Sequence, residues 1–136
     1  MADRTVSYSG SIDDLEEGHL GGGFFEGWAA PPSPLQHLQI LRNSAHVVVA
    51  RDDGGAVIGF VNALSDGVLA AYIPLLEVLP EHRGNGIGTE LVRRLLATLG
   101  DLYMIDVMCD DEVRPFYERL GFARSAGAVV RNYAWA

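Results

Sequence analysis

Apolar positions in the first part of the chain follow the pattern of short strands joined by tight turns. Residues 46–51 and 56–64 are two apolar runs, and the turn residues at positions 52–55 separate them, so the pair predicts a β-hairpin. Residues 68–78 form a longer apolar run after a second turn, which predicts a largely buried strand. A short alternating segment at residues 5–8 predicts one further strand ahead of the hairpin.

Two helix starts precede the hairpin. Ser33-Pro34-Leu35-Gln36 combines a capping serine, a proline at the first helical position and a glutamine three residues after the cap. It predicts a helix that stops at Asn43. An earlier cap at Ser11 predicts a short helix, which the three glycines at positions 21–23 end. The apolar stripe of the longer helix consists of Leu35, Leu38 and Leu41.

The spacing then changes to alternating helices and strands. Helices are predicted over residues 86–99 and 112–120, each followed by a glycine, with a buried strand over residues 102–108 between them. From residue 122 the pattern predicts a final strand region. Its apolar positions are Val129, Val130 and Tyr133. Together these elements predict an α/β fold over residues 1–136: one domain with a mixed sheet of about six to seven strands and helices on both faces.

Composition narrows the classes of function. The 136 residues are 49% hydrophobic and carry a formal charge of −8, so we expect one packed core and no nucleic-acid partner. All ten basic residues are arginine, which excludes a lysine Schiff base and the lysine of a P-loop. The single cysteine, Cys109, favours a cytoplasmic protein, and the four histidines have no metal-binding spacing. The longest apolar stretch, residues 68–76, is too short to cross a membrane, and Pro74 interrupts it.

The candidate chemistry begins where the apolar run 68–78 ends. Arg83, Gly84, Gly86 and Gly88 lie just before the predicted helix. Glycines let a ligand approach the backbone, and the first turn of a helix offers free N–H groups and a partial positive charge. The loop therefore predicts an anion site. It lacks the third glycine of the dinucleotide fingerprint in either register and fits R-x-x-G-x-G instead.

This R-x-x-G-x-G loop resembles the pyrophosphate loop of the GNAT N-acetyltransferase superfamily. Phe116-Tyr117-Glu118-Arg119-Leu120-Gly121-Phe122 resembles the F-Y-x-x-L-G-F segment of the same superfamily and lies about thirty residues downstream, after one strand. The resemblance implies a GNAT fold with central strands that splay apart near Val78 and Met108. It implies acetyl-CoA as co-substrate, with no metal. The implied cofactor-binding residues are Val78, Leu79, Arg83, Gly84, Asn85, Gly86, Ile87, Gly88, Thr89 and Asp110.

The resemblance also implies an N-acetyltransferase in which an amine attacks the thioester directly in a ternary complex. A backbone N–H of Val78 or Leu79 is expected to bind the thioester oxygen, and Tyr117 to protonate the departing thiolate. Glu77 is the first candidate for the general base, with Asp106 or a water molecule as alternatives. Asp110 stands where many members of the superfamily carry asparagine, which leaves its role open.

Phe24, Phe25 and Trp28 follow the three glycines, and they predict either a lid over the core or a wall of the acceptor site. With the negative charge of the chain they favour a small cationic amine as acceptor, aromatic amines included. Residues 132–135 are expected to contribute to the same site. A protein amine is an alternative acceptor, and a non-catalytic acyl-CoA sensor or regulatory module is the alternative function. The resemblance further implies a homodimer.

Overall fold

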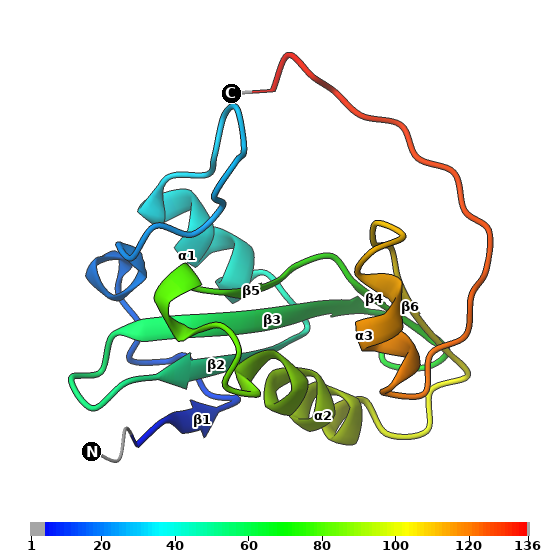
Figure 1. Ribbon diagram of the computed structural model, residues 1–136, viewed down its shortest axis with the longest axis horizontal. Helices are drawn as coiled ribbons and strands as arrows, with labels where there is room; N and C mark the ends of the chain where they lie inside the picture. Colours follow the sequence, from blue (N-terminus) through cyan, green and yellow to red (C-terminus); the bar gives the residue numbers. More distant parts are fainter. Residues whose placement is uncertain (1–4, 136) are drawn as a thin grey trace.

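The computed structural model describes residues 5–135, and their central feature is a six-stranded mixed sheet (Figure 1). The strands are β1 (Ser7–Ser9), β2 (His46–Arg51), β3 (Val57–Ser65), β4 (Ala70–Ile73), β5 (Leu76–Val78) and β6 (Met104–Val107). The α-helices of this part of the chain are α1 (Pro34–Arg42), α2 (Ile87–Leu99) and α3 (Arg114–Glu118), and the 3-10 helices are η1 (Glu17–Leu20) and η2 (Pro80–His82). The prediction of a mixed α/β sheet is confirmed.

The sheet has the order β1-β2-β3-β4-β6, and β5 pairs with β3 beyond the end of β4. The predicted single strand over residues 68–78 is wrong in one respect, because it breaks into β4 and β5 at Pro74. Leu64 pairs with Tyr72 while Val61 pairs with Leu76, so the segment that contains Pro74 has one residue more than its partner, as in a β-bulge. β4 runs parallel to β6, whereas β5 has β3 as its only partner strand among the described residues. The two central strands thus separate, as the resemblance implied.

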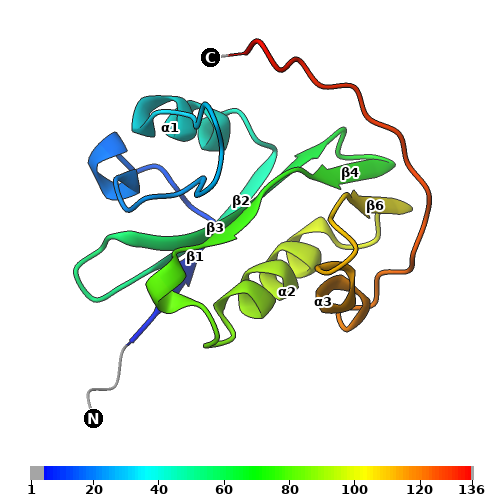
Figure 2. The same cartoon turned by 45° about the horizontal axis from the view of Figure 1, so that its top comes forward.

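Helices cover both faces of the sheet (Figure 2). On one face, Leu38 and Leu41 of α1 pack in a buried cluster with Phe60 of β3. On the other face, Leu91 and Leu95 of α2 pack with neighbouring β3 side chains. Gly59 brings α2 close to the sheet, since a Cβ there would lie 3.2 Å from both the Glu77 carbonyl oxygen and Leu91 Cδ1. This close approach places the N-terminal half of α2 against β3, beside β5.

Local signals of the sequence set most element ends, with two exceptions. The helix start predicted at Ser33 is confirmed as a capping box, called here the Ser33 box. The Ser33 hydroxyl accepts from the Gln36 N–H at 3.1 Å, and the Gln36 side chain accepts from the Ser33 N–H at 2.9 Å. The predicted helix after Ser11 is wrong, because the chain turns there and η1 is capped instead by Glu16. The predicted helix over 112–120 shortens to α3, with Pro115 in its first turn.

The last part of the chain departs most from the predictions. β6 is not buried: Met104 and Asp106 are exposed, and Ile105 and Val107 are half-buried, because β6 is the edge of the sheet. The predicted strand region after residue 122 does not form. Residues 123–135, called here the C-terminal arm, make no strand pairing with the described residues, and their only regular feature is a turn at residues 133–134. Figure 1 shows the arm, in orange and red, leaving α3 and passing the β6 end of the sheet before it runs clear of it. A Cβ on Gly127 of the arm would lie 3.3 Å from Met108 Cε, just after β6.

Candidate active site

Three segments meet at Gly88, in the first turn of α2. A Cβ placed on Gly88 would lie 3.6 Å from Cζ of Phe116 in α3 and 3.9 Å from Cγ2 of Val78 at the end of β5. The two sequence motifs and the end of the central strand are therefore in contact. This convergence defines the candidate active site.

The glycine loop presents a series of free backbone N–H groups at this point. Gly84 and Gly86 adopt φ values of +81° and +78°, a region that glycine occupies without steric cost. Within the described residues no hydrogen bond engages the N–H groups of residues 84–89, and the first intrahelical bond is from the Glu90 N–H to the Gly86 carbonyl. At the N-terminus of α2, no side-chain hydrogen bond caps the helix at Gly86. The loop can therefore bind a pyrophosphate through backbone donors and the helix dipole.

Arg83 holds the loop against its neighbours. Its Nε donates to the Val78 carbonyl at 3.0 Å, and its Nη1 lies 3.4 Å from Glu26 Oε1. The guanidinium thus joins the end of β5 to the segment that carries Phe24 and Phe25. Asn85 donates its side-chain amide to the His82 carbonyl at 3.3 Å, so it also stabilises the loop.

The two predicted oxyanion donors differ in their hydrogen bonding. The Leu79 N–H donates to the Ile58 carbonyl at 2.9 Å and is already used in pairing with β3. Antiparallel pairing alternates the direction of successive N–H groups, so the Val78 N–H points away from β3, toward the space between β5 and β6. Of the two, Val78 has the geometry that an oxyanion donor needs.

Glu77 lies on β5, and its carboxylate contacts residues 24–28, which carry Phe24, Phe25 and Trp28 and are called here the aromatic segment. Its Oε1 accepts the Phe25 N–H at 2.8 Å. Burial raises the pKa of Glu77, while the Phe25 hydrogen bond and the charge of Arg83 oppose that rise. Phe25 has a positive φ of 65°, which is unfavourable for a bulky side chain. The carboxylate therefore positions this loop as well as being a candidate base.

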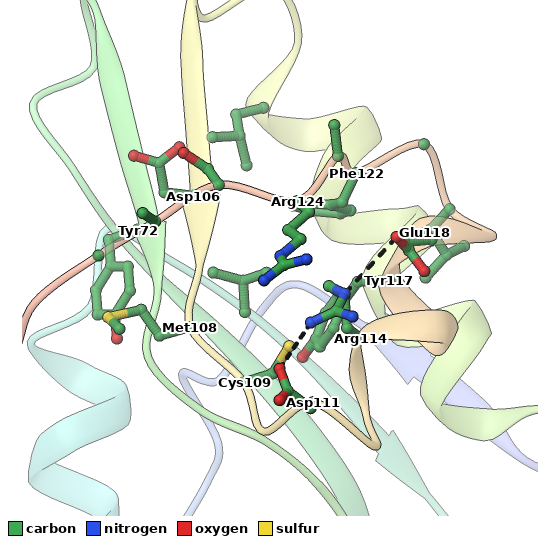
Figure 3. A pocket seen from close by; sticks show the side chains of 18 of the residues that line it. Tyr72, Asp106, Met108, Cys109, Asp111, Arg114, Tyr117, Glu118, Phe122 and Arg124 are labelled. Carbon is green, nitrogen blue, oxygen red and sulfur yellow. Dashed lines mark hydrogen bonds and ion pairs between the residues drawn. The ribbon is translucent and has the colours of Figure 1, made fainter.

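Tyr117 is buried on α3, packed edge-on against Phe116 and Phe122. Burial, with a smaller contribution from Cys109, raises the pKa of Tyr117 to about 12. The phenol therefore keeps its proton at neutral pH, as a proton donor must. Figure 3 shows its hydroxyl directed toward Cys109, at the end of a groove between β6 and α3.

The aromatic segment is divided between core and surface. Phe25 is buried, and Phe24 and Phe25 both pack edge-on against His37 of α1, with ring centroids at 5.2 and 5.0 Å. Trp28 stacks edge-on against Phe25 and is half exposed. The first two side chains close the core, and Trp28 alone of the three retains a large free surface. Sequence reasoning missed His37, because nothing in its local pattern signals a buried histidine.

The two other predicted acids lie elsewhere. Asp106 is on the exposed face of β6 and borders the same groove as Tyr117. Glu77 does not border this groove. Asp110 is exposed, and its carbonyl accepts the N–H groups that begin α3. Among residues 5–135, no group of three or more histidine, cysteine or acidic side chains is placed to hold a metal ion, and no helix is long and apolar enough to cross a membrane.

Comparison with known proteins identifies the family. A sequence profile of the acetyltransferase (GNAT) family matches residues 14–122. The chain belongs to the GNAT acetyltransferase family. The GNAT family uses acetyl-CoA, and the free N–H groups of the glycine loop fit the pyrophosphate of that molecule.

The GNAT domain has relatives of several kinds. It is 51% identical to a provisionally assigned acetyltransferase from Deinococcus radiodurans R1, whose crystal structure aligns with a TM-score of 0.92 over 98% of this chain and 94% of that one. It is 41% identical to GCN5-related N-acetyltransferase 3, chloroplastic, of Arabidopsis thaliana over 70 aligned residues. These residues cover 50% of this chain and 30% of the relative. It is 31% identical to histone acetyltransferase TAP1 of Glycine max, over 71% of this chain and 46% of the relative. The matches thus span less than half the length of these two plant proteins.

Proposed function

We propose that this protein transfers the acetyl group of acetyl-CoA to a small primary amine by direct attack in a ternary complex. The observation that carries the proposal is the contact of Gly88 with Phe116 and Val78, which unites the anion-binding loop, the α3 motif and the end of β5. Acetyl-CoA would supply a thioester, an acetyl group activated for attack by an amine.

The end of β5 supports the reaction by electrostatics. When an amine attacks the carbonyl carbon, negative charge develops on the carbonyl oxygen. A fixed N–H donor stabilises that charge, and the Val78 N–H is free of pairing with β3. Residues 84–89 are the binding groups for the pyrophosphate, and Arg83 keeps this loop and β5 in a fixed relation.

Two side chains supply the proton transfers in this proposal. Glu77 accepts the proton of the attacking amine, directly or through a water molecule, and its raised pKa makes it a stronger base than an ordinary glutamate. Tyr117 protonates the leaving thiolate, and its buried phenol is protonated at neutral pH. Asp106 is a weaker candidate base, since it lies on β6 rather than on the strand that carries Val78.

The acceptor is proposed to be a small cationic amine. Trp28 offers a half-exposed aromatic surface, and Glu26 and Glu77 add negative charge beside the same segment. Aromatic side chains attract amine cations. A protein amine is the second candidate acceptor, supported by the similarity to histone acetyltransferase TAP1. A cytoplasmic location and a homodimer stay predictions from the sequence.

The proposal is tested first by binding and then by turnover. A ligand at about 100 times its Kd stabilises a protein by about 2.7 kcal/mol, which should raise the melting temperature by several degrees. We expect this shift with acetyl-CoA and none with ATP or NAD. Release of free CoA thiol is then measured with small aryl and alkyl amines and with a lysine-containing peptide. Binding without turnover on any amine would favour the acyl-CoA sensor, and no shift would contradict both functions.

A further inference from the structure

The one cysteine of the chain, Cys109, has no part in the proposed reaction, yet it lies beside the candidate active site. It follows the end of β6 by two positions and is an exposed, free thiol. Cys109 and Tyr117 line the same groove, and Figure 3 shows the Tyr117 hydroxyl directed toward the cysteine. Cys109 also contributes to the raised pKa of Tyr117, so the two groups are close enough to interact electrostatically.

The Tyr117 hydroxyl lacks a partner of its own. The side chain is only 5% exposed, but within residues 5–135 its hydroxyl makes no hydrogen bond, and none is drawn from it in Figure 3. A polar group that is buried without a partner is costly, so a buried hydroxyl that points into a site indicates a ligand there. The ligand that satisfies this hydroxyl lies between Tyr117 and Cys109.

The proposed function brings a second sulfur atom to the same hydroxyl, and the inference rests on that function. Tyr117 is the proposed proton donor to the departing thiolate, so the sulfur of CoA has to come within hydrogen-bond reach of its hydroxyl. The free N–H groups of residues 84–89 bind the pyrophosphate and thereby fix the other end of the same molecule. Because the hydroxyl is directed toward Cys109, the sulfur of CoA and the sulfur of Cys109 approach one point.

Two sulfur atoms at one point are placed for thiol–disulfide exchange, and the chain favours CoA over other thiols as the partner. A disulfide formed from CoA carries the pyrophosphate that residues 84–89 bind, whereas a disulfide such as that of glutathione carries none. Binding at the loop raises the effective concentration of the CoA sulfur at Cys109. Because the chain has no second cysteine to displace it, a CoA group joined to Cys109 stays until an external thiol removes it.

We propose that Cys109 is a modification site at which CoA disulfide forms a reversible mixed disulfide with the protein. The thiolate of Cys109 attacks one sulfur of CoA disulfide, and the other CoA leaves as a thiolate that takes up the proton that Cys109 lost. One S–S bond forms as one breaks: the sulfur of Cys109 is oxidised and that of the departing CoA is reduced. The attached CoA occupies the acetyl-CoA site, so the modified protein is inactive until a thiol releases it. Acetyl-CoA has no free thiol and protects Cys109.

The first experiment follows adduct formation on the full chain by intact-mass spectrometry and uses no acceptor. CoA disulfide is compared with pantethine, which has the same thiol arm without the pyrophosphate, and with glutathione disulfide. We expect one CoA per chain, formed at least about tenfold faster than either control adduct and slowed at least about tenfold by excess acetyl-CoA. Dithiothreitol should restore the original mass. Equal rates with CoA disulfide and pantethine, or no protection by acetyl-CoA, would overturn the proposal.

The second experiment moves the thiol. Cys109→Ser should form no adduct, and Cys109→Ser combined with Ser125→Cys places the only thiol at another exposed residue of the same groove. We expect this double variant to react with CoA disulfide and pantethine at similar rates and without protection by acetyl-CoA. A preference for CoA disulfide that persists after the move would show that the position of Cys109 does not direct the reaction, which contradicts the proposal.

Failure of this inference is distinguishable from failure of the proposed function, because acetyl-CoA binding is measured separately by the shift in melting temperature. A shift with acetyl-CoA but no selective adduct leaves the proposed function in place and contradicts the Cys109 site. A selective adduct without turnover on any amine supports the Cys109 site and contradicts acetyl transfer.

Discussion

At the scale of single residues, the buried phenol of Tyr117 gives the sharpest prediction. Tyr117→Phe keeps the ring contacts with Phe116 and Phe122 and removes the proton donor. We expect kcat to fall about 100-fold or more, the usual contribution of a general acid, with the acetyl-CoA Kd unchanged. Because the pKa of Tyr117 is raised to about 12, its ionisation should not shape the wild-type pH profile below about pH 10.

The control for this variant is Tyr103→Phe, which makes the same chemical change at a side chain that is 84% exposed. Both variants are compared by steady-state kinetics and by calorimetric titration with acetyl-CoA. Equal turnover in the wild type and Tyr117→Phe would remove Tyr117 from the role of proton donor.

Glu77 has two separable roles, and a pair of variants distinguishes them. Glu77→Gln removes the base but keeps an oxygen that can accept the Phe25 N–H, whereas Glu77→Ala removes both. We expect both variants to lose most of kcat and only Glu77→Ala to lose acceptor affinity as the loop loosens. Since the pKa of Glu77 is raised, the active, ionised form appears as pH rises through that raised value, and this acid limb should vanish in Glu77→Gln.

The measurement for Glu77 is the pH dependence of kcat/KM between pH 4 and 9. Ionisation of a buried carboxyl also costs folding stability as pH rises, so Glu77→Gln should be at least as stable as the wild type at pH 8. An unchanged acid limb in Glu77→Gln would assign the proton transfer to another group, with Asp106→Asn as the next variant to measure.

At the scale of elements, the glycine loop contains glycines that serve different purposes. Gly88 has room for a methyl group, since a Cβ would make only ordinary contacts with Phe116 and Val78. Gly88→Ala should therefore preserve or slightly raise the melting temperature, because alanine is favoured over glycine in a helix by up to about 1 kcal/mol. It should still weaken acetyl-CoA binding if the ligand passes over this turn. Gly86→Ala, with φ at +78°, should lose about 1–2 kcal/mol of stability.

Thermal melts with and without acetyl-CoA separate these effects. The expected pattern is a stable Gly88→Ala variant with a reduced ligand-induced shift, beside a destabilised Gly86→Ala variant. A full ligand-induced shift in Gly88→Ala would mean that the helix start does not contact the cofactor.

Local sequence patterns predict some of the helices, strands and turns of this fold and not others. The Ser33 box, the hairpin at Asp52–Gly55 and the helix after Gly86 were predictable, because each depends on a few neighbouring residues. The break at Pro74 carried a signal as well, since proline cannot donate within a sheet. The exposed side of β6 could not be predicted, and neither could the lack of strand pairing in the described part of the arm. Strand propensity does not determine with which neighbouring strand a segment forms hydrogen bonds.

The same limit applies to the candidate site. The motifs predicted the loop and Tyr117 by resemblance, and the structure brings them into contact at Gly88. The choice between Val78 and Leu79 required the register of β5 on β3, which depends on the bulge at Pro74. The engagement of Glu77 with Phe25, 52 positions apart in sequence, is a long-range contact that no local pattern encodes.

For the molecule as a whole, the buried His37 predicts how global stability responds to acid. His37 is 1% exposed, its Nε2 has no hydrogen-bond partner among the described residues, and burial lowers its pKa to about 4. The unfolded chain binds a proton at this residue near pH 6.5, so the stability associated with neutral His37 is complete above that pH. It is lost as pH falls from about 6.5 toward 4, by up to about 3 kcal/mol.

His37→Phe tests this pH dependence, because it keeps a ring among Phe24, Phe25 and Phe60 and removes the titrating group. Protonation of Glu77 acts in the opposite direction over part of the range, since its pKa is raised, and it is common to both proteins. The difference between the unfolding free energies of variant and wild type therefore isolates His37. Urea unfolding at intervals from pH 7.5 to 4.5 should show this difference growing in favour of His37→Phe as the pH falls. A constant difference would mean that His37 is accessible to protons in the folded state, and that the aromatic cluster which fixes α1 to the sheet opens readily.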